Sequence, residues 1–338
     1  MTYYPSSHEV LLFGGFGPGC VLVCNDTWAF AHGNWTNVVS STNCTATTCP
    51  SARADAMMAY YAPLNAVLLF GGGVSFLGFT TTYNDTWMFY GGVWHNVTAS
   101  VGPAPSPRWA ASMAWDSLDN YEVLFGGALA GGQTLGDTWT FDGHWHNITA
   151  SQNPSPIPRA GAAITGSPSG YLLLFGGEQW NGATDLILYD DPASCYLNHV
   201  TWWFYQGHWI IMHYSACPNG PKLPSYTTPG FPSPCGRVDA ALGWSPKNGR
   251  FVVYGGYGPI WSAGGRCGGT TYDYLNDTWV YLAAPGGAAG TSTASNWGYA
   301  GDTGDPSNRS GMGYASDFTD NYFEIFGGGG ASGTYNST

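Results

Sequence analysis

The feature of this sequence that most constrains its fold is a short apolar run that ends in two glycines and recurs along the chain. The six copies read VLLFGG at 10–15, VLLFGG at 67–72, EVLFGG at 122–127, LLLFGG at 172–177, FVVYGG at 251–256 and FEIFGG at 323–328. Each run is rich in β-branched or aromatic residues and is too short for a helix, so it predicts a buried β-strand. Recurrence at intervals of roughly fifty residues or more predicts a repeat architecture.

Three further features accompany the runs. A tryptophan string follows the first five: NDTWAF from 25, NDTWMF from 84, GDTWTF from 136, HVTWWF from 199 and NDTWVY from 276. Its polar and apolar residues alternate, which predicts a strand with one buried face. A glycine turn then leads to another tryptophan strand, through Trp35, Trp94, Trp145, Trp209 and Trp297. An arginine opens a small-residue apolar stretch ahead of five runs, at Arg53, Arg108, Arg159, Arg237 and Arg309. That stretch suits an innermost strand, so each repeat predicts four antiparallel strands.

Units of this size cannot bury a core alone, whereas units packed radially share one. We therefore expect a single all-β domain, a six-bladed β-propeller of four-stranded antiparallel blades. The blades fall at about 1–50, 51–105, 106–156, 157–234, 235–305 and 306–338. The last one contains Arg309 and the run at 323–328 but no outer strand pair, so we expect it to be incomplete. An incomplete blade leaves an open strand edge, which invites pairing.

The glycine doublet, the NDTW string and the later tryptophan together resemble kelch repeats, as found in kelch proteins and in the propeller of galactose oxidase. The resemblance extends over nearly the whole chain and implies structural roles for the doublets, tryptophans and arginines. The residues so implied are Gly71, Gly72, Trp28, Trp87, Trp139, Trp279, Arg53, Arg108, Arg159, Arg237 and Arg309. Two repeats depart from the pattern, because the fourth has NHVTWW and the fifth a long insertion before Asn276. The fold hosts adaptors, lectin-like binders and enzymes, so the resemblance selects no function.

Charge limits the possible partners. Charged residues make up 9% of the chain, against about 25% in ordinary domains, and the formal net charge is −12. Five of the nine basic residues are the repeat arginines. This composition argues against nucleic acid and anionic lipid as partners. No apolar run is long enough to insert into a membrane.

Two features indicate an extracellular location at the cell surface. The first is a set of Asn-x-Ser/Thr sequons, the acceptors of N-glycosylation. Three of them, Asn25, Asn84 and Asn276, are also explained by the repeat string itself. Better acceptors lie at or just past the outer strands, at Asn34, Asn43, Asn96 and Asn147. Asn308 and Asn336 complete the set.

The second feature is eight cysteines at loop positions. Proximity favours four disulfides, Cys20–Cys24, Cys44–Cys49, Cys217–Cys235 and Cys195–Cys267, although the sequence alone does not fix connectivity. Metal binding is the alternative. The CVLVC spacing at 20–24 does not suit zinc, however, and no histidine lies at ligand spacing. Disulfides imply an oxidising compartment.

No catalytic constellation is recognisable, so no catalytic or metal residue is assigned. The copper set of the galactose oxidase family is not found, because five histidines fall around the turns into the outer strands: His32, His95, His144, His146 and His208. Asp55 and Asp239 each follow a repeat arginine by two residues. They either pair with it, the simpler interpretation, or point into a central channel. Calcium is considered only for one acidic loop, with Glu178, Asp185, Asp190 and Asp191.

Aromatic residues outside the repeats concentrate in long loops, which suits a binding or assembly surface, stacking on sugars, or packing beneath the loops. The binding candidates are Trp180, Tyr196, Tyr257, Trp261 and Tyr272. The sequence thus predicts a glycosylated surface propeller with a structural or binding role. We expect it to self-assemble into a layer, fibre or filament, with copies of itself, other surface proteins or glycans as partners. The alternatives are a secreted carbohydrate-binding module of a longer protein and a sugar-acting enzyme that uses Asp55 or Asp239.

Overall fold

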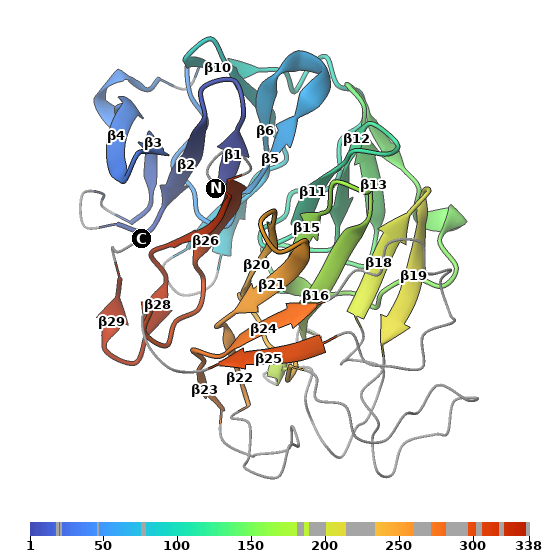
Figure 1. The fold of residues 1–338 in the computed structure, drawn as a ribbon. Coiled ribbons are helices and arrows are strands. Elements are labelled where there is room, and N and C mark those ends of the chain that lie inside the picture. Colours follow the sequence, from blue (N-terminus) through green and yellow to red (C-terminus); the bar gives the residue numbers. More distant parts are fainter. Residues whose placement is uncertain are drawn as a thin grey trace.

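Figure 1 shows the fold as a computed structural model. The structure describes residues 1–17, 20, 22–45, 47–75, 79–180, 186–188, 201–213, 234–259, 272–281, 297–301, 306–317 and 321–335. Among these residues no helix has the length and apolarity needed to cross a membrane. Apart from three single turns of 3₁₀-helix, at Ser41–Asn43, Ala62–Leu64 and Thr149–Ser151, the regular structure is β-sheet.

Five antiparallel sheets have the four-stranded path that the repeats predict. The first contains β1 (Thr2–Tyr4), β2 (Glu9–Gly15), β3 (Cys24–Ala31) and β4 (Asn34–Val39). The second contains β5 (Met57–Tyr61), β6 (Ala66–Phe70), β9 (Thr86–Tyr90) and β10 (Val93–Asn96). The third contains β11 (Ser112–Asp116), β12 (Tyr121–Phe125), β13 (Thr138–Phe141) and β14 (Trp145–Asn147).

The fourth and fifth sheets follow the same path around their long insertions. The fourth contains β15 (Ala160–Gly166), β16 (Leu172–Trp180), β18 (Thr201–Tyr205) and β19 (His208–His213), with β17 (Leu186–Leu188) paired to the end of β16. The fifth contains β20 (Ala241–Ser245), β21 (Arg250–Tyr254), β24 (Thr278–Tyr281) and β25 (Trp297–Gly301). In the four-stranded sheets the strand before the glycine doublet lies second from the axis, and residues 66–70 of β6 have no exposed surface.

The predicted six blades are confirmed only in part. A two-stranded sheet of β26 (Gly313–Asp317) and β27 (Tyr322–Phe326) stands where the sixth blade was expected. The described residues therefore form five four-stranded blades and this pair. Three short hairpins follow glycine doublets outside the blades: β7 (Gly73–Ser75) with β8 (Phe79–Thr82), β22 (Tyr257–Pro259) with β23 (Tyr272–Tyr274), and β28 (Gly329–Gly330) with β29 (Gly333–Thr334).

The innermost strands surround one axis. β1 contacts β5, β5 contacts β11, β11 contacts β15, β15 contacts β20, β20 contacts β26, and β26 contacts β1. Figure 1 shows these strands facing a common centre, with the N-terminus among them. The β26–β27 pair thus closes the ring between the fifth blade and the first.

Neighbouring blades are joined by a repeated aromatic contact. The Phe70 ring of β6 packs against the Trp145 ring of β14 at 4.9 Å, and the Trp145 indole donates a hydrogen bond of 3.0 Å to the Thr86 hydroxyl. The same ring pair recurs at Phe13–Trp94, Phe125–Trp209 and Phe175–Trp297. The equivalent indole bonds are Trp94 to Thr27, Trp209 to Thr138 and Trp297 to Thr201. Phe326 of β27 packs against Trp35 of β4 at 4.7 Å, which continues the pattern across the last interface.

Within a blade, the repeat arginine ties three segments together. Arg108 has no exposed surface, and its Nη1 and Nη2 donate to the two carboxylate oxygens of Asp137 at 2.7 and 2.8 Å. Its Nη1 also donates to the carbonyl of Gly126, and the Trp139 indole donates to Asp137. Equivalent ion pairs join Arg53 to Asp85 and Arg237 to Asp277. The simpler interpretation of Asp55 and Asp239 is therefore wrong, because their arginines pair with the aspartate of the tryptophan string.

Candidate binding site at the channel mouth

Five residues at one end of the channel are linked in series by four backbone hydrogen bonds. Each stands two positions after a repeat arginine: Asp55, Ala110, Gly161, Asp239 and Gly311. The N–H of each of the last four donates to the carbonyl of the one before it in this order, at 2.9–3.1 Å. All five have φ between +48° and +67°, the left-handed region that is costly for residues other than glycine. We call this set the mouth ring.

Two members of the mouth ring, Asp55 and Asp239, have carboxylates. Both side chains are exposed to the channel although protein surrounds them. Burial raises the pKa of Asp55 to about 6. Burial, and then the negative charges of Asp55 and Glu178, raise the pKa of Asp239 well above its ordinary value. A Cβ on Gly161 would lie 2.6 Å from Oδ1 of Asp239, so this carboxylate lies over the glycine and extends toward the neighbouring blade.

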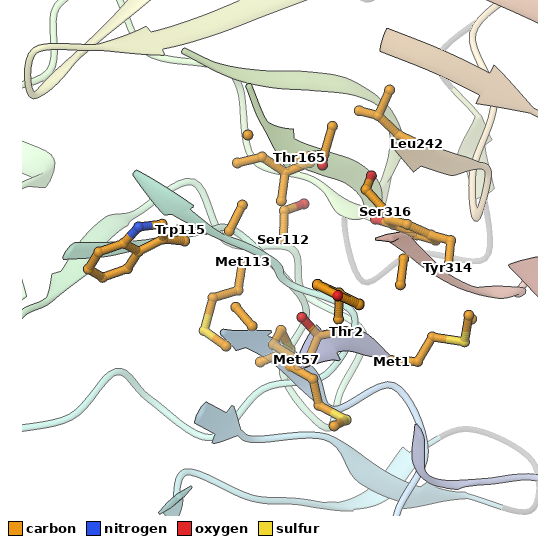
Figure 2. Close-up of a pocket in the computed structure, with 18 of the residues that line it drawn as sticks. Met1, Thr2, Met57, Ser112, Met113, Trp115, Thr165, Leu242, Tyr314 and Ser316 are labelled. Carbon is orange, nitrogen blue, oxygen red and sulfur yellow. The ribbon is translucent and has the colours of Figure 1, made fainter. Parts of the chain in front are cut away.

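Below the mouth ring, the channel holds a cavity of about 510 Å³. Its lining includes both carboxylates and side chains from all the innermost strands. Figure 2 shows Met57, Ser112, Met113, Thr165 and Tyr314 around this space, and they come from four innermost strands, β5, β11, β15 and β26. The wall therefore combines flexible thioethers and aromatic rings with several hydroxyl groups, whereas the two acidic side chains lie at the mouth.

The mouth ring lies on the face of the propeller that carries the extra hairpins. The starts of β5, β20 and β26 lie next to glycine doublets, as the bridges Ala54–Gly73, Val238–Tyr257 and Ser310–Gly329 show. The hairpins β7–β8, β22–β23 and β28–β29 begin at these bridges. We call this the loop face. The opposite turn face carries the tight connections between first and second strands, such as those around Leu64, Leu118 and Tyr322.

The predicted aromatic candidates are placed only in part. Tyr257 and Tyr272 lie on the β22–β23 hairpin of the loop face, with their rings stacked at 6.4 Å, and Tyr274 packs edge-on against Tyr257 at 5.4 Å. These three rings form one aromatic ridge beside the mouth ring. Trp180 ends β16, which extends from the same face. Tyr196 and Trp261 lie outside the described residues.

The proposed calcium loop is likewise seen only at its start. Glu178 lies on β16 opposite Ala160 and Leu188, and burial raises its pKa to about 7. Asp185, Asp190 and Asp191 lie outside the described residues. In the described part of the chain, no three histidine, cysteine or acidic side chains are grouped to hold a metal ion.

Two disulfides are present in the described residues, Cys20–Cys24 and Cys44–Cys49, with Cα–Cα distances of 5.3 and 5.2 Å. Cys235 is also disulfide-bonded, while Cys195, Cys217 and Cys267 lie outside the described residues.

The sequons differ in their surroundings. Asn34, Asn84, Asn96, Asn147 and Asn308 are exposed, whereas Asn25 and Asn276 are half-buried. Asn43 ends a 3₁₀ turn, and Asn336 lies outside the described residues. Asn96 and Asn147 share one conformation, in which the side-chain oxygen accepts from the N–H of the sequon threonine.

The sequence did not reveal the cavity lining. The innermost stretches were recognised from their small apolar residues, but Met57, Met113 and Tyr314 were not singled out. The alternation of side chains along a strand could have identified the lining, because successive side chains of an innermost strand point to opposite faces of its sheet. Which of the two alternating sets faces the channel depends on the packing between blades.

Comparison with known proteins agrees with the fold. The sequence model of the KLHDC2/KLHL20/DRC7 Kelch-repeats domain matches residues 1–203. An F-box/kelch-repeat protein of Arabidopsis thaliana is 28% identical over 56% of this chain and 37% of its own length. Dynein regulatory complex subunit 7 of Chlamydomonas reinhardtii is 36% identical over 34% of this chain and 10% of its own length. The chain thus spans well under half of each of these relatives.

A solved structure, that of YjhT, matches 98% of this chain and 90% of its own with a TM-score of 0.62 and 15% identity, which supports the fold alone. The family model covers more than half of the chain and the repeated arginine, glycine and tryptophan contacts recur from blade to blade. This chain belongs to the kelch-repeat family of β-propellers.

Proposed function

We propose that this chain is a protein-binding propeller that holds its partner on the loop face. The observation that carries the proposal is the cavity, whose lining includes all five residues of the mouth ring. Kelch propellers typically bind proteins. Concave sites on a rigid scaffold, framed by loops, are where such folds bind their ligands.

The aromatic ridge of Tyr257, Tyr272 and Tyr274 supports the choice of face. Tyrosine rings bury much area at low entropy cost and recur in interface hot spots. Here they lie on a hairpin next to the mouth ring, so a partner that covers the mouth also reaches the ridge.

Peptide display tests this proposal. A phage library of random peptides would be selected on the immobilised chain, and the strongest binders titrated by fluorescence anisotropy. We expect Tyr257→Ala, on the loop face, to weaken binding, and Tyr322→Ala to leave it unchanged. Tyr322 is a matched control because it is 62% exposed on the turn face. Binding lost in the Tyr322 variant and retained in the Tyr257 variant would place the site on the wrong face.

We also propose that the chain folds in an oxidising, extracellular compartment and carries N-glycans. Two disulfides and the exposed Asn96 and Asn147 support this location. Mass spectrometry of native protein, after enzymatic deglycosylation in heavy-oxygen water, would mark each occupied asparagine. Unmodified asparagine at all sequons, together with free thiols at Cys20 and Cys44, would contradict it.

Self-assembly is a second candidate function. Among the described residues β27 pairs on one edge, with β26, and exposed strand edges bind further strands. Analytical ultracentrifugation over a range of protein concentrations tests this. Concentration-dependent association is expected. A protein that stays monomeric over the whole concentration range would contradict self-assembly.

A further inference from the structure

We infer that the mouth ring selects a basic side chain, a lysine or arginine of a partner protein, which enters the channel between Asp55 and Asp239. This inference rests on the proposed function and specifies its partner. The partner is thus a protein whose exposed segment presents at least one basic residue to the loop face.

The placement of the two carboxylates is the first step. The mouth-ring order of hydrogen bonds runs from Asp55 through Ala110 and Gly161 to Asp239, so two uncharged positions separate the acids. The second and fifth blades that carry them therefore face each other across the channel. The negative charge of Asp55 raises the pKa of Asp239, so the two carboxylates repel each other. A cation placed between them is attracted by both.

The second step is that the repeat arginines beside the two acids do not neutralise them. Arg53 and Arg237 are buried and pair with Asp85 and Asp277. Within the described residues, no hydrogen bond contributes to the pKa of Asp55 or Asp239, which burial and neighbouring negative charge alone raise. Both carboxyl groups are therefore available to a ligand, and a cation bound between them would favour their ionised forms.

The third step is the shape and chemistry of the space below. The cavity of about 510 Å³ lies within the roughly 300–1,000 Å³ of ligand pockets. Met57 and Met113 offer apolar, adaptable contact to an alkyl stem, and Tyr314 offers an aromatic face. Lysine and arginine combine an apolar stem with a charged end, so a basic side chain matches both parts of the site. An acidic peptide would be repelled at the mouth.

Charge complementarity over the whole surface favours the same partner. The formal net charge is −12, and five of the nine basic residues are repeat arginines with at most 3% exposure. A basic segment is therefore steered toward this protein, and the mouth ring decides where it docks.

The experiment uses the display-selected peptides and two conservative variants. Asp55→Asn and Asp239→Asn remove the charges but keep side-chain size, and asparagine tolerates the left-handed backbone at both positions. Glu9→Gln is the matched control, because it removes one negative charge at the turn-face end of β2. We expect selected peptides to be enriched in lysine and arginine. We expect binding to weaken on the order of tenfold or more in the double asparagine variant, and to stay unchanged in Glu9→Gln.

Three outcomes separate this inference from the proposed function. Basic peptides that bind the double variant as tightly as the unmodified chain would overturn the inference. Peptides without basic residues that depend on Tyr257 would overturn it too, while the proposed function stands. Selection of no peptide that binds the loop face would overturn both. Circular dichroism and thermal melting of each variant confirm that a loss of binding is not a loss of folding.

Discussion

Two buried carboxyl groups of this protein, those of Asp137 and Glu122, have pKa values shifted in opposite directions. Burial alone would raise the pKa of Asp137, but the hydrogen bond and positive charge of Arg108 outweigh it and hold the pKa below its usual value. Glu122 has the opposite environment. It is fully buried, neither carboxylate oxygen has a hydrogen-bond partner among the described residues, and burial raises its pKa well above the ordinary value. The corresponding positions of the other runs hold Val10, Val67, Leu172, Phe251 and Phe323.

Replacing Asp137 by asparagine should destabilise the fold by about 3–5 kcal/mol, since it leaves the buried Arg108 without a counter-charge. The depressed pKa of Asp137 gives stability that is present at neutral pH and is lost as the pH falls through the folded-state pKa. Urea unfolding at several pH values measures both effects. A stability loss in the variant that persists undiminished in strong acid would argue against the ion pair as its cause.

Replacing Glu122 by leucine should stabilise the protein at neutral pH. The folded-state pKa is raised, so stability falls by about 1.4 kcal/mol per pH unit as the pH rises from the unfolded-state pKa to the folded one. The advantage of the variant should therefore shrink as the pH falls from the folded-state pKa toward about 4.5, the ordinary value. Denaturation midpoints of both proteins at pH 4 and pH 7 would show this, and equal differences at the two pH values would contradict it.

At the scale of the strand, the sequence predicts the blades well and their closure poorly. The second strands, the tryptophan strands and the innermost strands can be predicted locally, because each repeat contains its own apolar alternation and glycine doublet. The contact of Phe326 with Trp35 joins residues from opposite ends of the sequence, so a local sequence pattern cannot predict it. The pairing of Arg53 with Asp85, rather than with the nearer Asp55, was missed for the same reason.

The candidate site was predicted in a similarly uneven way. Asp55 and Asp239 were recognised as possible channel groups from their position after an arginine. Their common placement in the mouth ring depends on the backbone bonds through Ala110 and Gly161, which are contacts between blades. The methionine and tyrosine lining depends on the same packing.

The indole bonds between blades give a test at this scale. Thr86→Val removes the acceptor of the Trp145 indole but preserves volume, and we expect a loss of about 1–3 kcal/mol because the indole is left buried without a partner. Thr81→Val, at an exposed position of β8, is the matched control and should change stability by less than about 0.5 kcal/mol. Chemical denaturation measures the two. Equal effects would mean that the bond contributes little to blade packing.

At the scale of the whole molecule, the ring of blades concentrates strain and charge at one end of the channel. Asp55 and Asp239 keep a left-handed backbone, and burial raises the pKa of each, so the mouth costs stability at neutral pH. Sites that bind ligands often carry such costs.

The double variant Asp55→Asn, Asp239→Asn should therefore melt at a higher temperature than the unmodified chain at pH 7. With a raised folded-state pKa, stability falls as the pH rises from the unfolded-state value, and the variant escapes this fall. Its advantage should diminish as the pH is lowered toward 3.8, the ordinary pKa, below which the unmodified carboxyls are mostly protonated in both states. Glu178 and Tyr314 face the same region and are unchanged in the variant, so they serve as a constant background. A variant that melts lower at pH 7 would contradict the charge repulsion.

The most direct measurement for the central claim, that a partner is held at the mouth of the propeller, is hydrogen–deuterium exchange with the tightest display-selected peptide. The account predicts slower exchange on binding in residues 54–57, 238–241 and 257–259, which form the mouth and the ridge, and no change in residues 62–65 and 117–120 of the turn face. Protection confined to the turn face, or to the edge strand β27, would contradict it.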